Sequence, residues 1–188
     1  PVWVGELYLE FHRGTFTSVA KVKRNNRRAE AMLRELETLA SLAWFSGAAD
    51  YPGEELAALW DIALLNQFHD ILPGSSIGLV YDDSDEDYAT FFARADVLRQ
   101  NLAGTLAGEG EMLLVNAFAQ ASGGLTMLAS DEPVTVAGRA SQTVVAADGV
   151  RLQAVPVDPV PGLGAARLPV ATATAGAAGN GSLKVTSE

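Results

Sequence analysis

Residues 32–43, Met-Leu-Arg-Glu-Leu-Glu-Thr-Leu-Ala-Ser-Leu-Ala, carry the pattern that decides the fold. Their apolar side chains recur at three- and four-residue spacing, so they form one stripe along a helix. The stripe contains Met32, Leu33, Leu36, Leu39, Ala40 and Ala43. Thr17 or Ser18 is the expected N-cap and Gly47 the expected end of this helix. We interpret the basic cluster at residues 21–28 as a solvated face of the same helix.

Two more helices are expected downstream. The first opens at residues 50–52, Asp-Tyr-Pro, which read as a cap followed by a proline near the first turn. Its expected buried face contains Leu56, Leu59, Trp60, Ala63 and Leu64. The second starts near Ser84, and its stripe contains Tyr88, Phe91, Phe92, Ala95, Leu98 and Leu102. Three amphipathic helices joined by short links are expected to pack as an antiparallel bundle.

The composition changes after residue 110, where Val, Thr, Gly and Pro become frequent and helical periodicity ends. Short strands are expected at residues 112–115, 134–136, 143–145 and 152–155, separated by glycine-containing turns. We interpret residues 171–181 as a flexible connection and residues 182–188 as the start of another strand. This region therefore predicts a partial β-sandwich.

The sequence as a whole predicts an α+β protein in three segments. Residues 1–16 read as a short strand followed by a loop. Residues 17–108 form the three-helix bundle, and residues 109–188 begin a C-terminal β-sandwich region.

Charge and composition exclude several kinds of site. The chain has 188 residues and a formal net charge of −10, which argues against nucleic acid as a partner. It has no cysteine, so any metal must be held by histidine and carboxylate groups. It has two histidines, His12 and His69, too few for a complete histidine-rich metal site. No apolar run approaches the roughly 20 residues of a membrane helix, and no signal peptide is visible at Pro1. The cytoplasmic location that we expect does not rest on that absence, because the chain reads as the inside of a longer protein.

The loop at residues 66–76, Asn-Gln-Phe-His-Asp-Ile-Leu-Pro-Gly-Ser-Ser, is the first candidate site. It places the imidazole of His69 beside the carboxylate of Asp70 at the end of a helix. A neutral imidazole is a good zinc ligand, and a carboxylate can accept hydrogen bonds from hydroxyl groups. A His-Asp pair at a helix end also commonly serves as a cap, so both interpretations stay open on spacing alone.

The second candidate site lies at residues 5–18, Gly-Glu-Leu-Tyr-Leu-Glu-Phe-His-Arg-Gly-Thr-Phe-Thr-Ser. The side chains that could line a sugar pocket there are Glu6, Tyr8, Glu10, His12 and Arg13. The alternative is a solvated loop with ordinary salt bridges. Glu6 and Glu10 are not a catalytic pair, because four residues along a strand span about 13 Å, too far for a retaining glycosidase.

Taken together, residues 5–18 and 64–76 resemble two stretches of the glycoside hydrolase family 38 α-mannosidases, in the same order and with a basic helix between them. The resemblance covers about residues 1–107. It implies that His69 is a zinc ligand and that Asp70 contacts both the metal region and the substrate hydroxyls.

The same resemblance implies a sugar-facing role for part of the second stretch. His12 and Arg13 stand where sugar contacts are expected, and Tyr8 and Glu10 are expected to shape that wall. It further implies that the nucleophile, the acid/base and the other zinc ligands lie in an N-terminal α/β barrel that the chain lacks, so no catalytic residue is expected in this chain. Residues 1–16 would then be the end of that barrel.

The implied protein is a zinc-dependent retaining α-mannosidase that hydrolyses terminal α-D-mannosyl residues. One Zn²⁺ ion would be completed by residues absent from this chain, and the isolated chain is expected to be inactive. The implied partners are an α-mannoside, the barrel and the C-terminal β domain of the same protein, and a second copy if the protein forms a homo-oligomer. The alternative is a non-catalytic helical and β scaffold, or a module that binds carbohydrate or protein.

Overall fold

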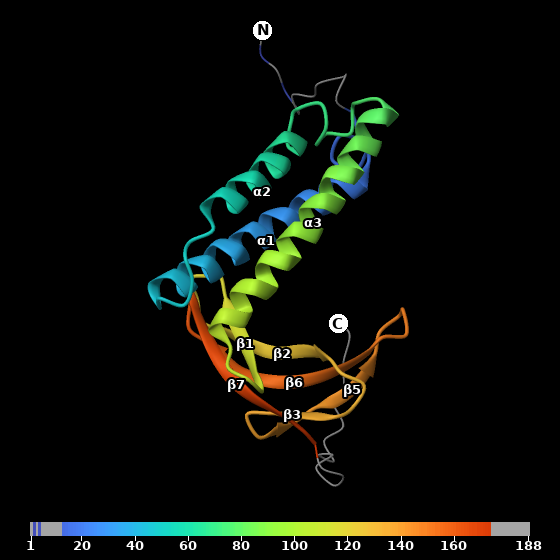
Figure 1. The fold of residues 1–188 in the computed structure, drawn as a ribbon. Coiled ribbons are helices and arrows are strands. Elements are labelled where there is room, and N and C mark those ends of the chain that lie inside the picture. Colours follow the sequence, from blue (N-terminus) through green and yellow to red (C-terminus); the bar gives the residue numbers. More distant parts are fainter. Residues whose placement is uncertain (1, 3, 5–12, 174–188) are drawn as a thin grey trace. The chain divides into compact units, whose positions relative to one another are not determined.

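A computed structural model describes residues 2, 4 and 13–173 of the chain (Figure 1). The chain divides into two compact units, Pro1–Leu102 and Ala103–Glu188. The first unit holds three helices and the second holds antiparallel sheets, so the expected α+β class is confirmed. The strand expected within residues 1–16 is not seen where the chain is described, because Val2 and Val4 have no regular secondary structure and are 93% and 91% exposed, and a turn begins at Arg13. The rest of that strand and the strand expected at residues 182–188 lie outside the described residues.

Helix α1 spans Ala20–Phe45 and buries the predicted stripe, with Met32 half-buried at its border. The predicted N-cap is wrong. The cap position is Val19, whose backbone is left-handed with φ 47° and which makes no side-chain capping bond. The hydroxyls of Thr17 and Ser18 instead donate to the carbonyls of Gly14 and Pro73, so neither is available to cap the helix.

Helix α2 spans Gly53–Asn66 and has Pro52 at its cap position, without a side-chain capping bond. The cap expected from Asp50 is therefore wrong. Leu56, Leu59 and Ala63 are buried as predicted, but Leu64 is 54% exposed. Its exposure places it on the outer side of the last turn of α2.

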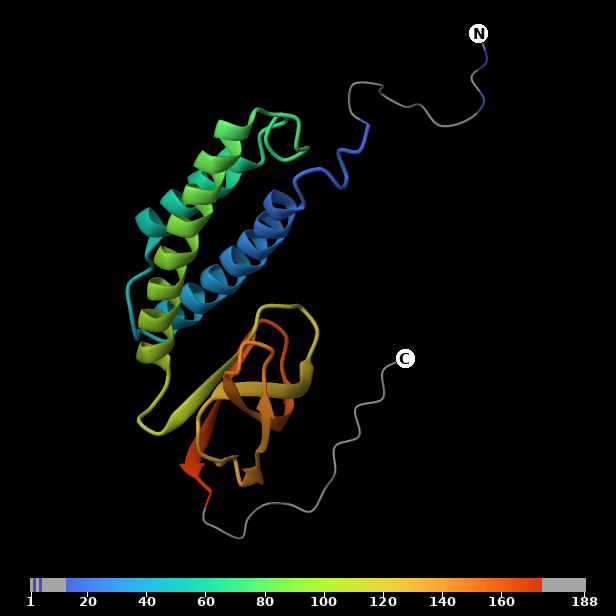
Figure 2. The same ribbon diagram turned by 90° about the vertical axis from the view of Figure 1, so that its right-hand side faces the viewer.

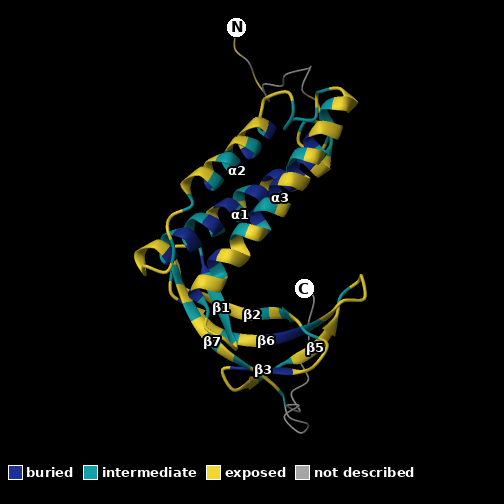
Figure 3. Cartoon of the chain, viewed as in Figure 1, coloured by how far each residue is buried: buried dark blue, intermediate teal, exposed yellow. Residues whose placement is uncertain are grey.

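Helix α3 spans Gly78–Leu106 and begins six residues before the predicted start at Ser84. Ser84 is 2% exposed because its hydroxyl donates a hydrogen bond inside the bundle, so it does not cap a helix. Tyr88, Phe91 and Ala95 follow it at four-, three- and four-residue spacing and are also buried. The three helices run alternately down, up and down, with their buried faces turned inward (Figures 1 and 3). Among the described residues, no helix combines the length and apolar character that a membrane span requires.

The second unit contains two antiparallel sheets in its described part (Figure 2). One sheet has the strand order β1-β7-β3-β4 and the other has the order β2-β6-β5. The strands are β1 Glu111–Asn116, β2 Ser122–Ala129, β3 Val134–Val136, β4 Arg139–Ala140, β5 Gln142–Val145, β6 Arg151–Val160 and β7 Gly164–Thr172. The sequence predicted β1, β3, β5 and the start of β6, and missed β2, β4 and β7.

Both sheets contribute to one core in this unit. Val134 and Val136 of β3 pack with Val155 of β6, and these are flanked by Met112, Leu128, Leu168 and Val170. The sharing of this core by two sheets agrees with the expected partial sandwich. Residues 171 and 172 belong to β7, so the flexible connection predicted from residue 171 begins too early, and residues 174–181 lie outside the described part.

Candidate functional site

The loop that follows α2 is anchored first by Asn66, the last residue of that helix. Asn66 is fully buried, and its Nδ2 group donates to Oδ2 of Asp87 at 3.0 Å and to the carbonyl of Ile62 at 3.0 Å. Its Oδ1 atom accepts a hydrogen bond from the Ser84 hydroxyl at 2.5 Å. These bonds satisfy the amide inside the bundle and tie the end of α2 to α3.

The next residue, Gln67, ties the same point to α1. Its Nε2 group donates to Oδ1 of Asn26 at 2.9 Å and to Oε1 of Glu30 at 3.1 Å. Asn26 is 6% exposed. Two consecutive amide side chains therefore bond to two different neighbouring helices.

His69 and Asp70 lie on the outer side of this anchored turn. The His69 side chain is 78% exposed and the Asp70 side chain is 57% exposed, with 3.6 Å between His69 Nε2 and Asp70 Oδ2. The ring of Phe68 lies beside the imidazole, with 4.1 Å between the ring centroids. The inward hydrogen bonds of the motif thus come from Asn66 and Gln67, while the imidazole and the carboxylate face outward.

The donor set of this turn fits half of a zinc site. Zinc prefers four ligands, and an outward imidazole with a neighbouring carboxylate can supply two of them. Within the described residues, no group of three or more His, Asp or Glu side chains is placed to hold a metal ion. Further ligands would have to come from other parts of the polypeptide.

The two stretches singled out by sequence meet in the structure. The Ser18 hydroxyl donates to the carbonyl of Pro73 at 2.8 Å, across 55 residues of sequence. The ammonium group of Lys23 donates to the carbonyls of Ser18 at 2.5 Å and Leu72 at 3.0 Å. Burial lowers the pKa of Lys23. The basic residues at positions 21–28 are therefore not only a solvated face, because Lys23 fastens the loop to α1.

Gly74 and Tyr81 complete the fixation of the loop. Gly74 has φ +84°, and a Cβ atom there would lie 2.6 Å from the Ser18 hydroxyl oxygen and 2.7 Å from the Ser18 carbonyl oxygen. The Tyr81 hydroxyl accepts a hydrogen bond from the Ser76 N–H at 3.0 Å and faces the Ile71 carbonyl at 3.3 Å. The backbone on both sides of His69 and Asp70 is held in place by groups from α1, α2 and α3.

The remaining predicted site residues receive less support. Tyr8, Glu10 and His12 lie outside the described residues. Arg13 is exposed at the start of the turn that leads to α1. The structure brings together His69 and Asp70, and it brings Ser18, at the end of the second stretch, against the same loop.

Sequence reasoning missed the anchoring residues, although a signal for them exists. Asn66 continues the buried spacing of Leu59 and Ala63 by three residues, and Ser84 precedes Tyr88 by four. A polar residue in register with an apolar stripe is buried by its neighbours and must find a hydrogen-bond partner there.

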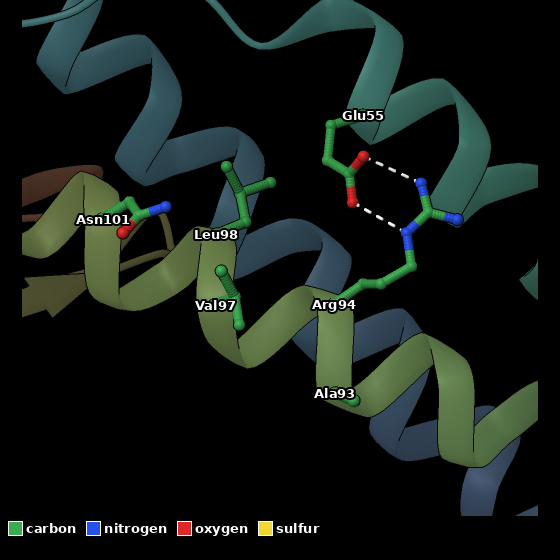
Figure 4. Close-up of a pocket in the computed structure, with 6 residues that line it drawn as sticks. All are labelled: Glu55, Ala93, Arg94, Val97, Leu98 and Asn101. Carbon is green, nitrogen blue, oxygen red and sulfur yellow. Dashed lines mark hydrogen bonds and ion pairs between the residues drawn. The ribbon is translucent and has the colours of Figure 1, made fainter.

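A pocket of about 470 Å³ lies at the other end of the bundle (Figure 4). It is lined by Glu55, Ala93, Arg94, Val97, Leu98 and Asn101. Arg94 donates to both carboxylate oxygens of Glu55, at 2.9 Å and 2.8 Å. The hydrogen bond from Arg94 lowers the pKa of Glu55, against the opposing effect of burial, and raises that of Arg94. Glu55 and Arg94 are bonded to each other, so we interpret the pair as a structural contact between α2 and α3.

The sequence also matches a known protein family. The model of the family described as the alpha mannosidase middle domain matches residues 10–106. The chain belongs to this family. The resemblance to the family 38 α-mannosidases that residues 5–18 and 64–76 carry is thereby confirmed.

Relatives within the family have closely similar sequences over the same region. The chain is 44% identical over 109 residues to Alpha-mannosidase 2C1 of Mus musculus, covering 57% of this chain and 10% of that protein. It is 47% identical over 83 residues to the Alpha-mannosidase of Saccharomyces cerevisiae, covering 43% of this chain and 8% of that protein. The chain thus matches about a tenth of the length of these relatives.

Solved structures share the fold. An alpha-mannosidase from Enterococcus faecalis matches with a TM-score of 0.65 and 14% identity over 86% of this chain and 24% of that one. A glycosyl hydrolase family 38 protein from the same organism matches with a TM-score of 0.65 and 13% identity over 92% of this chain and 26% of that one. The three helices lie within the residues that the family model matches, and the helices and antiparallel sheets together share the fold of these solved structures.

Proposed function

We propose that this chain is the middle section of a zinc-dependent retaining α-mannosidase, in which His69 supplies a zinc ligand and Asp70 contacts hydroxyl groups of the sugar. The observation that carries the proposal is the outward, adjacent placement of the two side chains on an anchored turn. A side chain that served only to cap α2 would turn back toward the helix end and would be expected to lose much of its exposure. The names of the relatives support the substrate class, α-mannosides.

The chemistry of the two groups fits this division of roles. The neutral imidazole of His69 offers a nitrogen lone pair to a metal, and the carboxylate of Asp70 accepts hydrogen bonds from hydroxyl groups. Zinc, when bound, would orient and polarise the mannose hydroxyls. Arg13, His12, Glu10 and Tyr8 are assigned to the wall of the sugar pocket as part of the same proposal.

The rest of the polypeptide is the proposed partner of this face. Large apolar side chains are exposed on the last turn of α2, in the loop and at the start of α3. They are Leu64, Leu65, Phe68, Ile77 and Leu79, each between 51% and 69% exposed. They lie close in sequence to His69 and Asp70, and exposed apolar side chains of this kind are typical of an interface. We assign this face to contact with the catalytic barrel, which would supply the remaining zinc ligands, the nucleophile and the acid.

The test uses the full-length protein that contains this chain. His69→Ala is expected to abolish stoichiometric zinc binding and to lower kcat for an α-mannoside by at least about 100-fold. His12→Ala is the matched control, because it removes the other histidine and is expected to raise KM while zinc content stays complete. Full zinc content and full activity after His69→Ala would contradict the proposal and favour a non-catalytic scaffold.

The isolated 188-residue chain gives a second test. It is expected to hydrolyse no α-mannoside, because a retaining mechanism needs two carboxyl groups about 5 Å apart on either side of the glycosidic bond. We assign both to the barrel. Measurable turnover by the purified chain would contradict this assignment.

A further inference from the structure

Polar side chains replace apolar ones on the buried stripes of all three helices, at the level of the candidate loop. Asn26 of α1, Asn66 of α2 and Ser84 of α3 continue these stripes, and each is at most 6% exposed. We call these three residues, with Glu30, Gln67 and Asp87, the polar layer. Burying such groups stabilises a bundle no better than apolar packing would, so stability alone does not explain the layer.

The hydrogen bonds that join the side chains of the polar layer converge on two residues. In each of these bonds, the amide group of Asn66 or Gln67 is the donor or the acceptor. Asn66 bonds to α3 and Gln67 bonds to α1. Asn66 is the last residue of α2 and Gln67 is its C-cap, so the two bonded side chains hold the end of α2 against both neighbouring helices. The orientation of this end sets the direction in which the chain leaves toward His69.

We propose that Asn66 and Gln67 are positioning residues, which fix the orientation of the His69 imidazole for zinc. The inference rests on the proposed function of His69. A metal ligand must be held close to its productive geometry, and hydrogen bonds behind the ligand serve that purpose in metal sites. Here the bonds act on the backbone of the turn, while the loop beyond it is held through Leu72 and Pro73.

Zinc affinity of the full-length protein tests the role of Gln67. Gln67→Ala removes the two hydrogen bonds to α1 and is expected to raise the zinc dissociation constant about 10-fold, measured by competition with a chelator. The cobalt-substituted protein is expected to show an altered visible absorption spectrum, because the coordination geometry changes. A merely structural role for Gln67 would leave that spectrum unmoved.

The matched control lies at the opposite end of α2. Glu55→Ala also removes two hydrogen bonds between helices, those from Arg94, and is expected to leave the zinc dissociation constant unchanged. If Glu55→Ala lowered the zinc affinity as much as Gln67→Ala, the effect would be attributed to general destabilisation of the bundle, and the proposal would be overturned. An unchanged affinity in Gln67→Ala would overturn it as well.

An exchange of the amide and the carboxylate between positions 66 and 87 tests the role of Asn66 without leaving a cavity in the polar layer. Asn66→Asp places a second carboxylate within hydrogen-bonding distance of Asp87 and is expected to weaken zinc binding, because the two charges repel. Adding Asp87→Asn restores a donor and an acceptor at the same place and is expected to recover most of the affinity. Absence of recovery, with the double variant folded by circular dichroism, would contradict the positioning role.

His69→Ala in the same assay separates this inference from the proposed function. If His69→Ala leaves zinc affinity unchanged, the proposed function fails and the inference fails with it. If His69→Ala removes zinc while Gln67→Ala has no effect, the positioning role alone fails.

Discussion

The two ends of the helical unit treat their polar side chains differently. At one end, Glu55 and Arg94 bond to each other, and both side chains remain more than a third exposed. At the other end, the amides of Asn66 and Gln67 are bonded inward, while His69 is left 78% exposed. The charged pair at the first end is bonded within itself, whereas the anchored turn at the second end leaves an imidazole accessible to a ligand, as the proposed function requires.

The largest expected effect is on stability at the Asn66 end. Asn66→Ala leaves the Ser84 hydroxyl and the Asp87 carboxylate without their partner inside the bundle, and it is expected to lower the free energy of unfolding by about 3 kcal/mol. Urea unfolding followed by helical circular dichroism measures this value. Asn101→Ala, at the exposed rim of the pocket at the other end, is expected to change it by less than about 0.5 kcal/mol. Equal effects at the two sites would break the comparison.

Glycine-to-alanine substitutions compare the same two ends of the helical unit through their backbone conformation. Gly74→Ala is expected to destabilise the chain by about 2 kcal/mol, because its φ of +84° is unfavourable for alanine and its Cβ atom would collide with Ser18. Gly47, after the far end of α1, has φ +71°, and a Cβ atom at that position would meet nothing within 4 Å. Gly47→Ala is therefore expected to lower the free energy of unfolding by about 1 kcal/mol, which is the penalty for alanine at a positive φ without any collision. A cost for Gly74→Ala no larger than for Gly47→Ala would contradict the close contact with Ser18.

The Glu55–Arg94 pair is expected to give a smaller, pH-dependent effect. Arg94 lowers the pKa of Glu55 from its ordinary value of 4.5 in the folded state. The stabilisation is therefore complete above that value and is lost as the pH falls through the lower folded-state pKa. Glu55→Gln is expected to reduce the melting temperature slightly at neutral pH, and the difference from the parent chain should shrink in acid. Because both side chains are exposed, the effect should stay below about 1 kcal/mol. Glu54→Gln is the control. If it changed the melting temperature with the same pH dependence as Glu55→Gln, the effect could not be attributed to the ion pair with Arg94.

The smallest effect is expected at Tyr88, which lies beside the polar layer. Burial, with the negative charges of Glu30 and Asp87, raises the pKa of Tyr88 to about 12. Its hydroxyl is buried and bonds to no group among the described residues. Tyr88→Phe is therefore expected to change the free energy of unfolding by less than about 1 kcal/mol, in either direction. A loss as large as that of Asn66→Ala would place the hydroxyl inside the hydrogen-bonded layer.

Apolar spacing and turn residues predicted more of the helical unit than of the β unit. The stripes of α1 and α3 place Leu33, Leu36 and Phe91 in the core, because a helical period is repeated over many residues. Strand β2 was missed because it begins with Ser122-Gly123-Gly124 and has a register shift there, and β7 was missed because Pro169 and three alanines dilute its pattern. Strands depend on pairing with distant segments, which local sequence does not report.

For this protein, the sequence by itself determined the family and the three amphipathic helices, and it singled out the pair His69–Asp70 as a candidate site. Only the tertiary structure decided which neighbours of that pair are anchors. Asn66, Gln67 and Lys23 bond to residues on other helices or in the loop. The spacing of Asn66 indicates its burial, but local spacing does not identify the bonded partners, which lie 21 to 49 residues away in the sequence. The 78% exposure of the His69 side chain is also visible only in the folded chain, because local spacing does not report which residues meet across the bundle.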